Sequence, residues 1–127
     1  MKKHIVMLLA SEKFRDCEYI VPKAFFEQSG IKVSVSSTKL LATGRFGFSV
    51  SCDILIDYLN PAAYDGIFFV GGAGSIDYMD NLTAKAVFEN FLKLHKPIAA
   101  ICAAPRNFLK WGILKDKKIW KGIRECK

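Results

Sequence analysis

The sequence predicts an α/β protein whose mostly parallel sheet carries helices on both faces. Three short runs, at residues 4–10, 67–70 and 98–101, are apolar at almost every position, as in strands that are covered on both sides. Segments with helical spacing of apolar residues alternate with these runs, which is typical of a parallel sheet. With 127 residues, the chain fits a single domain over 1–127.

The first strand, at 4–10, is followed by a loop at 11–15 and then by a helix. Asp16 is a suitable N-cap for this helix, which is expected to run to about residue 29 and to end at Gly30. Pro22 lies near its first turns, where we expect a kink. The side chains expected on its inner face are Ile20, Val21, Ala24, Phe25 and Gln28.

The middle of the chain adds two strands and an excursion between them. Residues 31–36 alternate polar and apolar, which predicts a strand near a sheet edge with one polar face. Glycines interrupt the segment 40–56, which indicates a hairpin-like excursion. The strand at 67–70 then enters a glycine-rich turn at 71–75, before a helix over about 81–94. This turn matches neither a phosphate loop nor a dinucleotide fingerprint.

The stretch 96–105 is organised around one cysteine. Its strand, 98–101, is apolar throughout and is expected to be central, and Cys102 follows at the turn into a helix over about 104–111. This is the arrangement of a nucleophile elbow, in which helix N–H groups favour the thiolate. Local sequence leaves a second interpretation open, because free cysteine is also a common core residue.

Composition excludes several classes of protein. No apolar run reaches the roughly 20 residues of a membrane span, and no leader pattern precedes the first strand, so we expect a cytoplasmic protein. The four cysteines lack metal-ligand spacing, so neither a metal nor another cofactor is predicted. Seven basic and two acidic residues over 110–127 carry +5 of the net charge of +7. Without a recognition motif, this basic tail is weak evidence for nucleic acid.

Three stretches together resemble the DJ-1/PfpI (ThiJ/PfpI) superfamily. They are Phe-Arg-Asp-Cys-Glu at 14–18, Tyr-Asp-Gly at 64–66 with the glycines of 71–74, and Ala-Ala-Ile-Cys-Ala-Ala-Pro at 99–105, followed by a matching segment at 111–118. The resemblance covers nearly the whole chain and implies a flavodoxin-like α/β sandwich.

The resemblance also implies a site. It makes Cys102 the reactive cysteine and Glu18 the carboxyl group beside it, with backbone N–H groups near Gly72 and Ala103 as oxyanion donors. A carboxyl group held partly out of water near a thiolate should have a raised pKa and could pass a proton to substrate. The alternative for Glu18 is an ordinary acid in the first turn of a helix, stabilised by the helix dipole.

Two departures from the family pattern bear on function. Members that act on carbonyl compounds often supply a histidine directly after the elbow cysteine or about twenty residues later, but no histidine follows Cys102 here. His4 and His95 are expected to be a strand-edge and a helix-end residue. The family domain also continues beyond this length, so we expect a truncated or shortened domain. Its exposed apolar surface favours either self-association, as a homodimer or a higher oligomer, or a missing companion segment.

These observations leave two main hypotheses for the function. The first is a cysteine-dependent hydrolase or glyoxalase-type enzyme acting on small carbonyl or amide substrates, or a sensor of oxidative stress, through Cys102. The second is a chaperone-like or redox-marked dimeric stress protein without turnover, which the absent histidine favours. An anion-binding domain that uses the loop 71–75 ranks last, because no phosphate-cradling pattern is present.

Overall fold

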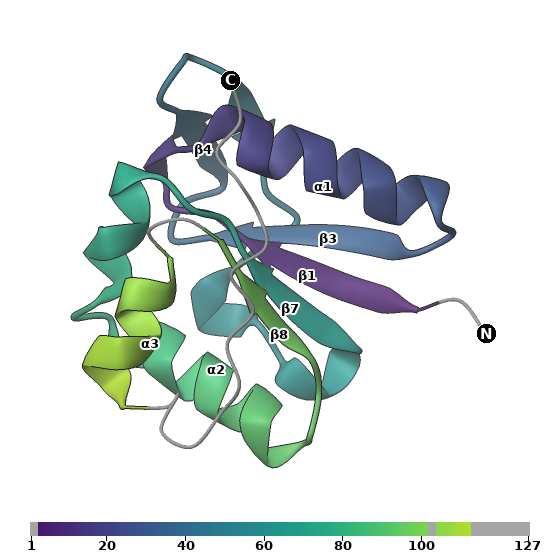
Figure 1. The fold of residues 1–127 in the computed structure, drawn as a ribbon, viewed down its shortest axis with the longest axis vertical. Coiled ribbons are helices and arrows are strands. Elements are labelled where there is room, and N and C mark those ends of the chain that lie inside the picture. The colour runs from purple at the N-terminus through teal and green to yellow at the C-terminus, as the bar shows by residue number, and fades with distance from the viewer. Residues whose placement is uncertain (1–2, 102–103, 113–127) are drawn as a thin grey trace.

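A five-stranded parallel sheet forms the centre of the molecule, in the order β6-β3-β1-β7-β8 (Figure 1). The structure is a computed structural model, and it describes residues 3–101 and 104–112. The strands of this sheet are β1 (His4–Leu8), β3 (Lys32–Ser37), β6 (Ile54–Leu55), β7 (Gly66–Phe69) and β8 (Ile98–Ala100). The predicted α/β architecture with a mostly parallel sheet is therefore confirmed.

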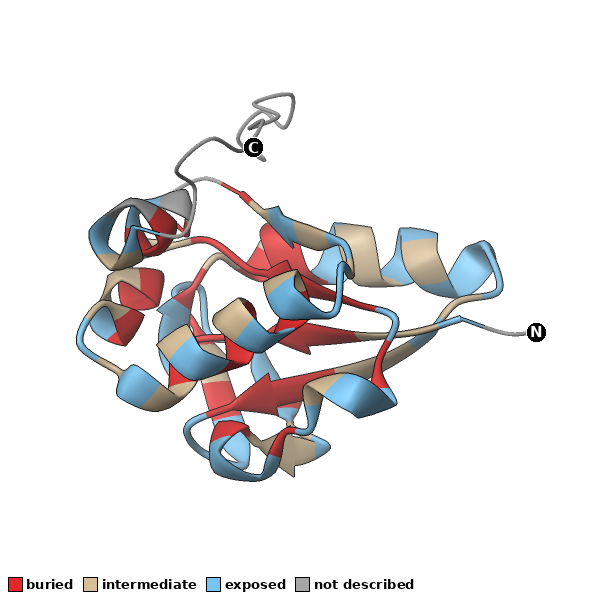
Figure 2. Cartoon of the chain, turned by 90° about the horizontal axis from the view of Figure 1, so that it is seen from below, coloured by how far each residue is buried: buried red, intermediate tan, exposed pale blue. Residues whose placement is uncertain are grey.

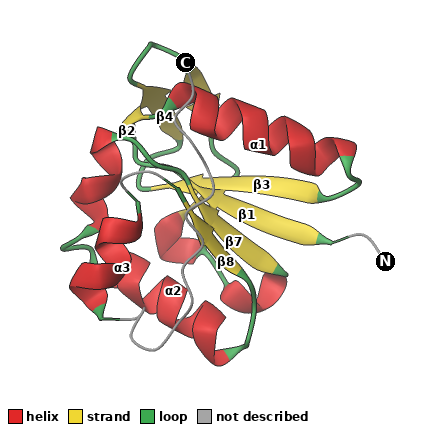
Figure 3. Cartoon of the chain, viewed as in Figure 1, coloured by secondary structure: helices red, strands yellow, loops and turns green. Residues whose placement is uncertain are grey.

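Helices cover the two faces of this sheet (Figure 3). They are α1 (Asp16–Gln28), α2 (Leu82–Lys93) and α3 (Pro105–Trp111), with 3-10 turns η1 (Ile56–Tyr58), η2 (Pro61–Ala63) and η3 (Ala73–Tyr78). Phe26 of α1 contacts Phe68, whereas Phe88 of α2 stacks on Phe69. Because neighbouring residues of a strand point to opposite faces, α1 and α2 lie on opposite sides of β7.

An aromatic cluster joins α2 and α3 to the sheet. Phe69 stacks on Phe88 with 5.1 Å between ring centroids, and Phe108 of α3 packs against both rings. Trp111 extends the cluster at the end of α3. Phe69, Phe88 and Phe108 are buried and Trp111 is partly buried; Figure 2 colours buried positions of the chain red. The rings fix α3 beside the end of β7.

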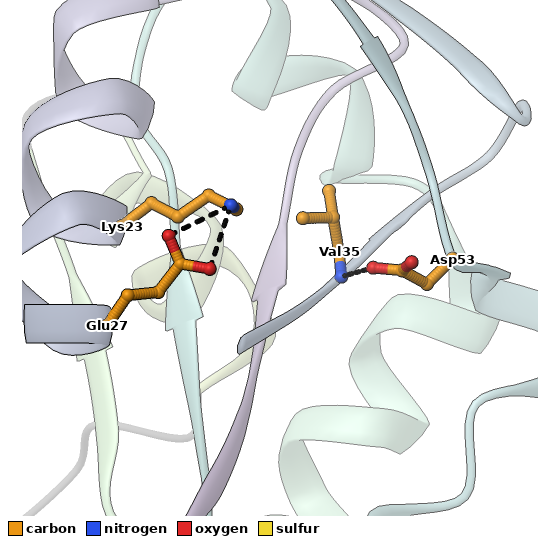
Figure 4. A network of polar contacts seen from close by, with 4 residues as sticks. All are labelled: Lys23, Glu27, Val35 and Asp53. Carbon is orange, nitrogen blue, oxygen red and sulfur yellow. Dashed lines mark hydrogen bonds and ion pairs between the residues drawn. The ribbon is translucent and has the colours of Figure 1, made fainter. Parts of the chain in front are cut away.

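The excursion at 40–56 contains a hairpin, as predicted, but the hairpin belongs to a second sheet, whereas the end of the excursion forms β6 of the central sheet. Strand β2 (Glu12–Phe14) pairs in parallel with β4 (Leu41–Gly44), which pairs antiparallel with β5 (Ser49–Ser51). The expected loop at 11–15 thus contains a strand. The hairpin supplies its hydrogen-bond partners, which could not be predicted from the local sequence Glu-Lys-Phe. Asp53 returns the chain to β3 through its backbone and its carboxylate, both bonded to Val35 at 2.8 Å (Figure 4).

The predicted orientation of α1 is wrong. Ile20, Val21 and Phe25 are 40%, 62% and 64% exposed, and the helix instead buries Asp16, Glu18 and Tyr19. Asp16 is also not the N-cap, because Arg15 holds that position. The Asp16 carboxylate accepts hydrogen bonds from the backbone N–H groups of Phe46 and Phe48 in the hairpin, which turns this side of the helix inward.

Several features of the helix boundaries follow the sequence. Helix α1 continues through Pro22, and its solvent side carries an ion pair between Lys23 and Glu27 at 3.1 Å (Figure 4). Gly30 and Gly112 follow the ends of α1 and α3 with positive φ, the conformation expected after a helix end. Asn81 caps α2 by accepting from the N–H of Ala84.

Strand β8 differs from its predicted central place. Within the described residues it is the outermost strand beside β7, and Ile98 and Ala100 are only partly buried. The sequence also predicts a short strand around residues 119–120, after the end of α3, and this segment lies outside the described residues. No helix in the described ranges 3–101 and 104–112 is long and apolar enough to cross a membrane.

Candidate active site

Three neighbouring strands end at one edge of the sheet. The chain leaves β1 and β7 at this edge through residues 9–15 and 70–75, and it leaves β8 there through Ile101. From β1 the sheet continues to β3 on one side, whereas β7 and β8 lie on the other side. The gap between β1 and β7 is therefore a topological switch point, where parallel α/β proteins place their ligands.

The loops after β1 and β7 are packed backbone against backbone. The N–H of Arg15 donates to the carbonyl of Gly71 at 2.9 Å. Gly72 has φ of 110°, and a side chain there would lie 2.5 Å from the Arg15 nitrogen, while a Cβ on Gly74 would overlap the carbonyl of Glu12. Glycine is thus required at both positions, because only a bare backbone allows this approach.

The contact with Arg15 also orients the amide of Gly72. In a trans peptide the carbonyl and the following N–H point in opposite directions. Because the carbonyl of Gly71 is bonded to Arg15, on the β1 side, the N–H of Gly72 points away from Arg15. Strand β8 lies on that other side of β7. In this orientation, the N–H of Gly72 can donate a hydrogen bond to a group that follows β8.

Glu18 lies in the first turn of α1, next to this edge, and is 1% exposed. Most first-turn acids are solvated, so burial of this carboxyl group is unusual. Its backbone N–H donates to the carbonyl of Arg15, whose own N–H bonds the glycine loop. Glu18 therefore belongs to the same packed unit as Gly72.

Cys102 and Ala103 lie outside the described residues, but both flanks are described. Ile101 donates to the carbonyl of Phe69 at 3.3 Å, and Ala104 donates to the carbonyl of Ile101 at 3.1 Å. Helix α3 begins one residue later, at Pro105. The predicted strand-to-helix turn is thus bounded on both sides, and it starts at the sheet edge that carries Glu18 and Gly72.

The remaining thiols and imidazoles differ from this arrangement. Burial, assisted by Asp53, raises the pKa of the Cys52 thiol to about 11, which keeps it protonated near neutral pH. Cys17 is half-buried on α1, and Cys126 lies outside the described residues. His95 is exposed after the end of α2, as expected.

His4 is more constrained than a strand-edge residue. It opens the central strand β1, its Nε2 lies 2.6 Å from Ser34 Oγ, and its ring contacts Tyr64. Burial and the nearby Lys32 charge lower the pKa of its imidazole. His4 lies at the start of β1, whereas the loops carrying Glu18 and Gly72 follow the strand ends.

One residue near the elbow was not identified from the sequence. Asn107 of α3 has no exposed surface, and its Nδ2 donates to the carbonyls of Ser75 and Ala104, each at 3.0 Å. The only hint in the sequence is its helical spacing, four residues before Trp111 on an inward-facing side. Among the described residues, no group of three or more His, Cys, Asp or Glu side chains could hold a metal ion.

The sequence profile of the DJ-1/PfpI family matches residues 3–123. The chain belongs to the DJ-1/PfpI family. Its family relatives include deglycase PfpI of Pyrococcus furiosus, which is 30% identical over 94% of this chain and 74% of its own length. An uncharacterized protein of Methanocaldococcus jannaschii is 38% identical over 90% of this chain.

Solved structures of the DJ-1/PfpI family share the fold. A ThiJ/PfpI domain protein from Brachyspira murdochii superposes with a TM-score of 0.85 at 30% identity, over 94% of this chain and 69% of that one. Oxidized DJ-1 of Toxoplasma gondii gives 0.84 at 24% identity, which supports the fold alone. The chain spans 57% of the length of the Methanocaldococcus relative.

Proposed function

We propose that this DJ-1/PfpI protein reacts with small carbonyl compounds through Cys102, with Glu18 as its proton donor and acceptor. The observation that carries the proposal is the burial of Glu18, 1% exposed, in a loop unit bonded to the glycine turn at the edge where Cys102 follows β8. A carboxyl group removed from water suits proton exchange with a neighbouring reacting atom. The deglycase name of the Pyrococcus relative supports a carbonyl-derived substrate.

The proposed step balances without a cofactor. The Cys102 thiolate adds to the carbonyl carbon, a carbon–sulfur bond forms, and the electron pair of the C=O π bond moves to oxygen. Glu18 gives its proton to that oxygen, which yields a hemithioacetal, and takes a proton back when the adduct collapses. The N–H groups of Gly72 and Ala103 are the proposed donors to the developing oxyanion.

The proposal requires Cys102 to be the most reactive of the four thiols. Limited alkylation with iodoacetamide at neutral pH, read by peptide mass spectrometry, should label Cys102 ahead of Cys17, Cys52 and Cys126. The protonated thiol of Cys52 should react slowest among the described cysteines, because burial raises its pKa to about 11. Preferential labelling of Cys17 would overturn the assignment.

The competing function is that of a redox-marked, chaperone-like protein without turnover. The absence of histidine from residues 103–127 favours this second function. Both functions use the same thiol, so thiol reactivity alone does not separate them. The two functions are separated by mass spectrometry of the protein after treatment with mild peroxide and, in a second sample, with methylglyoxal. Oxidation of Cys102 without any carbonyl adduct would support the redox function.

We also propose a second copy of this chain as a partner, docked on the α1–hairpin face. This face consists of Ile20, Val21, Phe25, Leu41, Phe46 and Phe48, each 40–76% exposed. The hydrogen bonds from Phe46 and Phe48 to Asp16 join its two halves. At about 200 Å² for a whole aromatic side chain, the face exposes roughly 600 Å² of apolar surface. A stable dimer needs about 800 Å² per partner, little more than half of it apolar.

Sedimentation equilibrium tests this partner. The unmodified chain should self-associate, and Val21→Glu with Phe25→Glu should give monomers, because two charges would be buried without partners. Leu82→Glu is the matched control, since Leu82 is 78% exposed on α2. A monomeric unmodified chain, or equal loss of association in the control, would contradict the proposal.

A further inference from the structure

Two side chains of α3 attach it to the turn that follows the glycine loop. Asn107 Nδ2 donates to the carbonyl of Ser75 at 3.0 Å, and Trp111 Nε1 donates to the carbonyl of Met79 at 2.9 Å. Donors and acceptors are both four residues apart, so the two bonds form successive rungs between α3 and η3. They differ in where they lie relative to the elbow.

Only the Asn107 rung reaches the elbow. Its Nδ2 also donates to the carbonyl of Ala104 at 3.0 Å, and the N–H of Ala104 in turn donates to the carbonyl of Ile101. Ile101 and Ala104 are the described residues on either side of Cys102 and Ala103. On the other side, Ser75 donates through both its N–H and its hydroxyl to the carbonyl of Gly72, at 3.1 and 2.7 Å. Asn107 thus connects Ala104, at the start of α3, with Ser75 and through it with the carbonyl of Gly72.

The amide of Asn107 donates two bonds from a buried position. Asn107 has no exposed surface, and both hydrogens of its Nδ2 are used. A buried polar group without bonds is costly, so these two bonds offset the burial of the amide. Both go to backbone carbonyls, one on each of the two segments that Asn107 joins.

We infer that Asn107 is a positioning residue, which holds the start of α3 in register with the glycine turn at 71–75 and thereby supports the proposed reactivity of Cys102. The inference deepens the proposed function and rests on it. Without the Asn107 amide, the carbonyls of Ser75 and Ala104 lose a shared donor, and the two loops are free to separate. Small misplacements of donors at a reacting centre cost large factors in rate.

The experiment compares Asn107→Leu, which keeps the approximate volume, with Trp111→Phe, which removes the other rung and keeps an aromatic ring. Two readouts are taken on the full chain: the rate of Cys102 alkylation by iodoacetamide from pH 5 to 9, and amide hydrogen exchange of the peptides around 70–76 and 98–106. Asn107→Leu should slow alkylation at pH 7 about tenfold, move its pH midpoint upward and speed exchange in both peptides. Trp111→Phe should stay within about twofold of the unmodified chain.

The two readouts separate the inference from the function it rests on. If the unmodified chain does not label first at Cys102, the proposed function fails, and hydrogen exchange alone decides whether Asn107 holds the two loops together. If Cys102 reacts but both variants behave alike in rate and exchange, the positioning role is overturned. Should Asn107→Leu fail to fold, Asn107→Ser, whose hydroxyl can donate to one carbonyl only, should show the same changes at smaller size.

Discussion

Glu18 lies in the first turn of α1 and is almost completely buried. These two properties of its position have opposite effects on a carboxyl group. An acid in the first turn is stabilised as an anion by the helix dipole, whereas burial favours the neutral form. Asp16, two residues earlier, accepts hydrogen bonds from the N–H groups of Phe46 and Phe48. The two acids of this helical turn thus differ: Asp16 fastens the hairpin, whereas Glu18 is buried beside the proposed site.

Replacing Glu18 by glutamine tests its place beside the sulfur. We expect Glu18→Gln to leave the fold intact and to raise the pH midpoint of thiolate formation at Cys102 by up to about one unit, because an amide is a weaker donor than a neutral carboxyl group. Thiolate absorbance against pH, measured beside Cys102→Ala to isolate this thiol, gives the midpoint. A downward shift would indicate an ionised Glu18, and identical curves would show that the two groups do not touch.

At the scale of elements, the site depends on two loops that meet without side chains between them. The turn at η3 lies against the loop around β2, with Gly74 directly over the carbonyl of Glu12 and near Ala10. The parallel pairing of β2 with β4 holds that loop from its other side. Any shift of η3 would therefore move the glycine turn, the hairpin and the start of α1 together.

Gly74→Ala should be destabilising for this reason. The added methyl group overlaps the backbone of Glu12, so a loop must move, and we expect a loss of about 3 kcal/mol or more in the free energy of unfolding. Gly47→Ala is the matched control, since Gly47 has open space around it and only its φ of 92° opposes a side chain, at about 1 kcal/mol. Urea unfolding measures both, and equal losses would argue against tight packing of the two loops.

The sequence predicted where helices and strands lie along the chain better than it predicted which side of each element is buried. Strands β1, β7 and β8 and helices α2 and α3 follow apolar periodicity and capping residues such as Asn81, because local sequence determines these features. The outward face of α1 could not be predicted, since periodicity reports that Val21 and Phe25 share a side and not what covers that side. Asn107 was missed because its partners are backbone carbonyls, which any sequence supplies. The family resemblance, and not periodicity, singled out Glu18.

At the scale of the whole chain, the small number of histidines bears on the proposed chemistry. Each adduct at Cys102 must gain a proton on oxygen and later lose one, and Glu18 is the acid proposed for both steps. A positioned acid or base contributes about a hundredfold to ten-thousandfold in rate. The segment 103–127 holds no histidine to share this work.

We therefore expect little or no steady-state turnover by this chain, although Cys102 remains open to alkylation and oxidation. Methylglyoxal and a small panel of esters and amides are the substrates to assay, with Cys102→Ala as the control. A robust rate that disappears in the control would contradict this expectation and would show that Glu18 suffices. Formation of a stable adduct at Cys102, without release of a product, would agree with the expected lack of turnover.

The central position of β1 also has a consequence for synthesis on the ribosome. Strand β1 emerges before both of its neighbours and can pair with β3 once α1 has formed, but its other edge waits for β7, which begins about 30 residues after β3 ends. At roughly 5–20 residues per second, this leaves an apolar strand edge without a partner for a few seconds. The nascent chain therefore passes through an interval in which chaperones, or a neighbouring nascent copy, can capture β1 before β7 does.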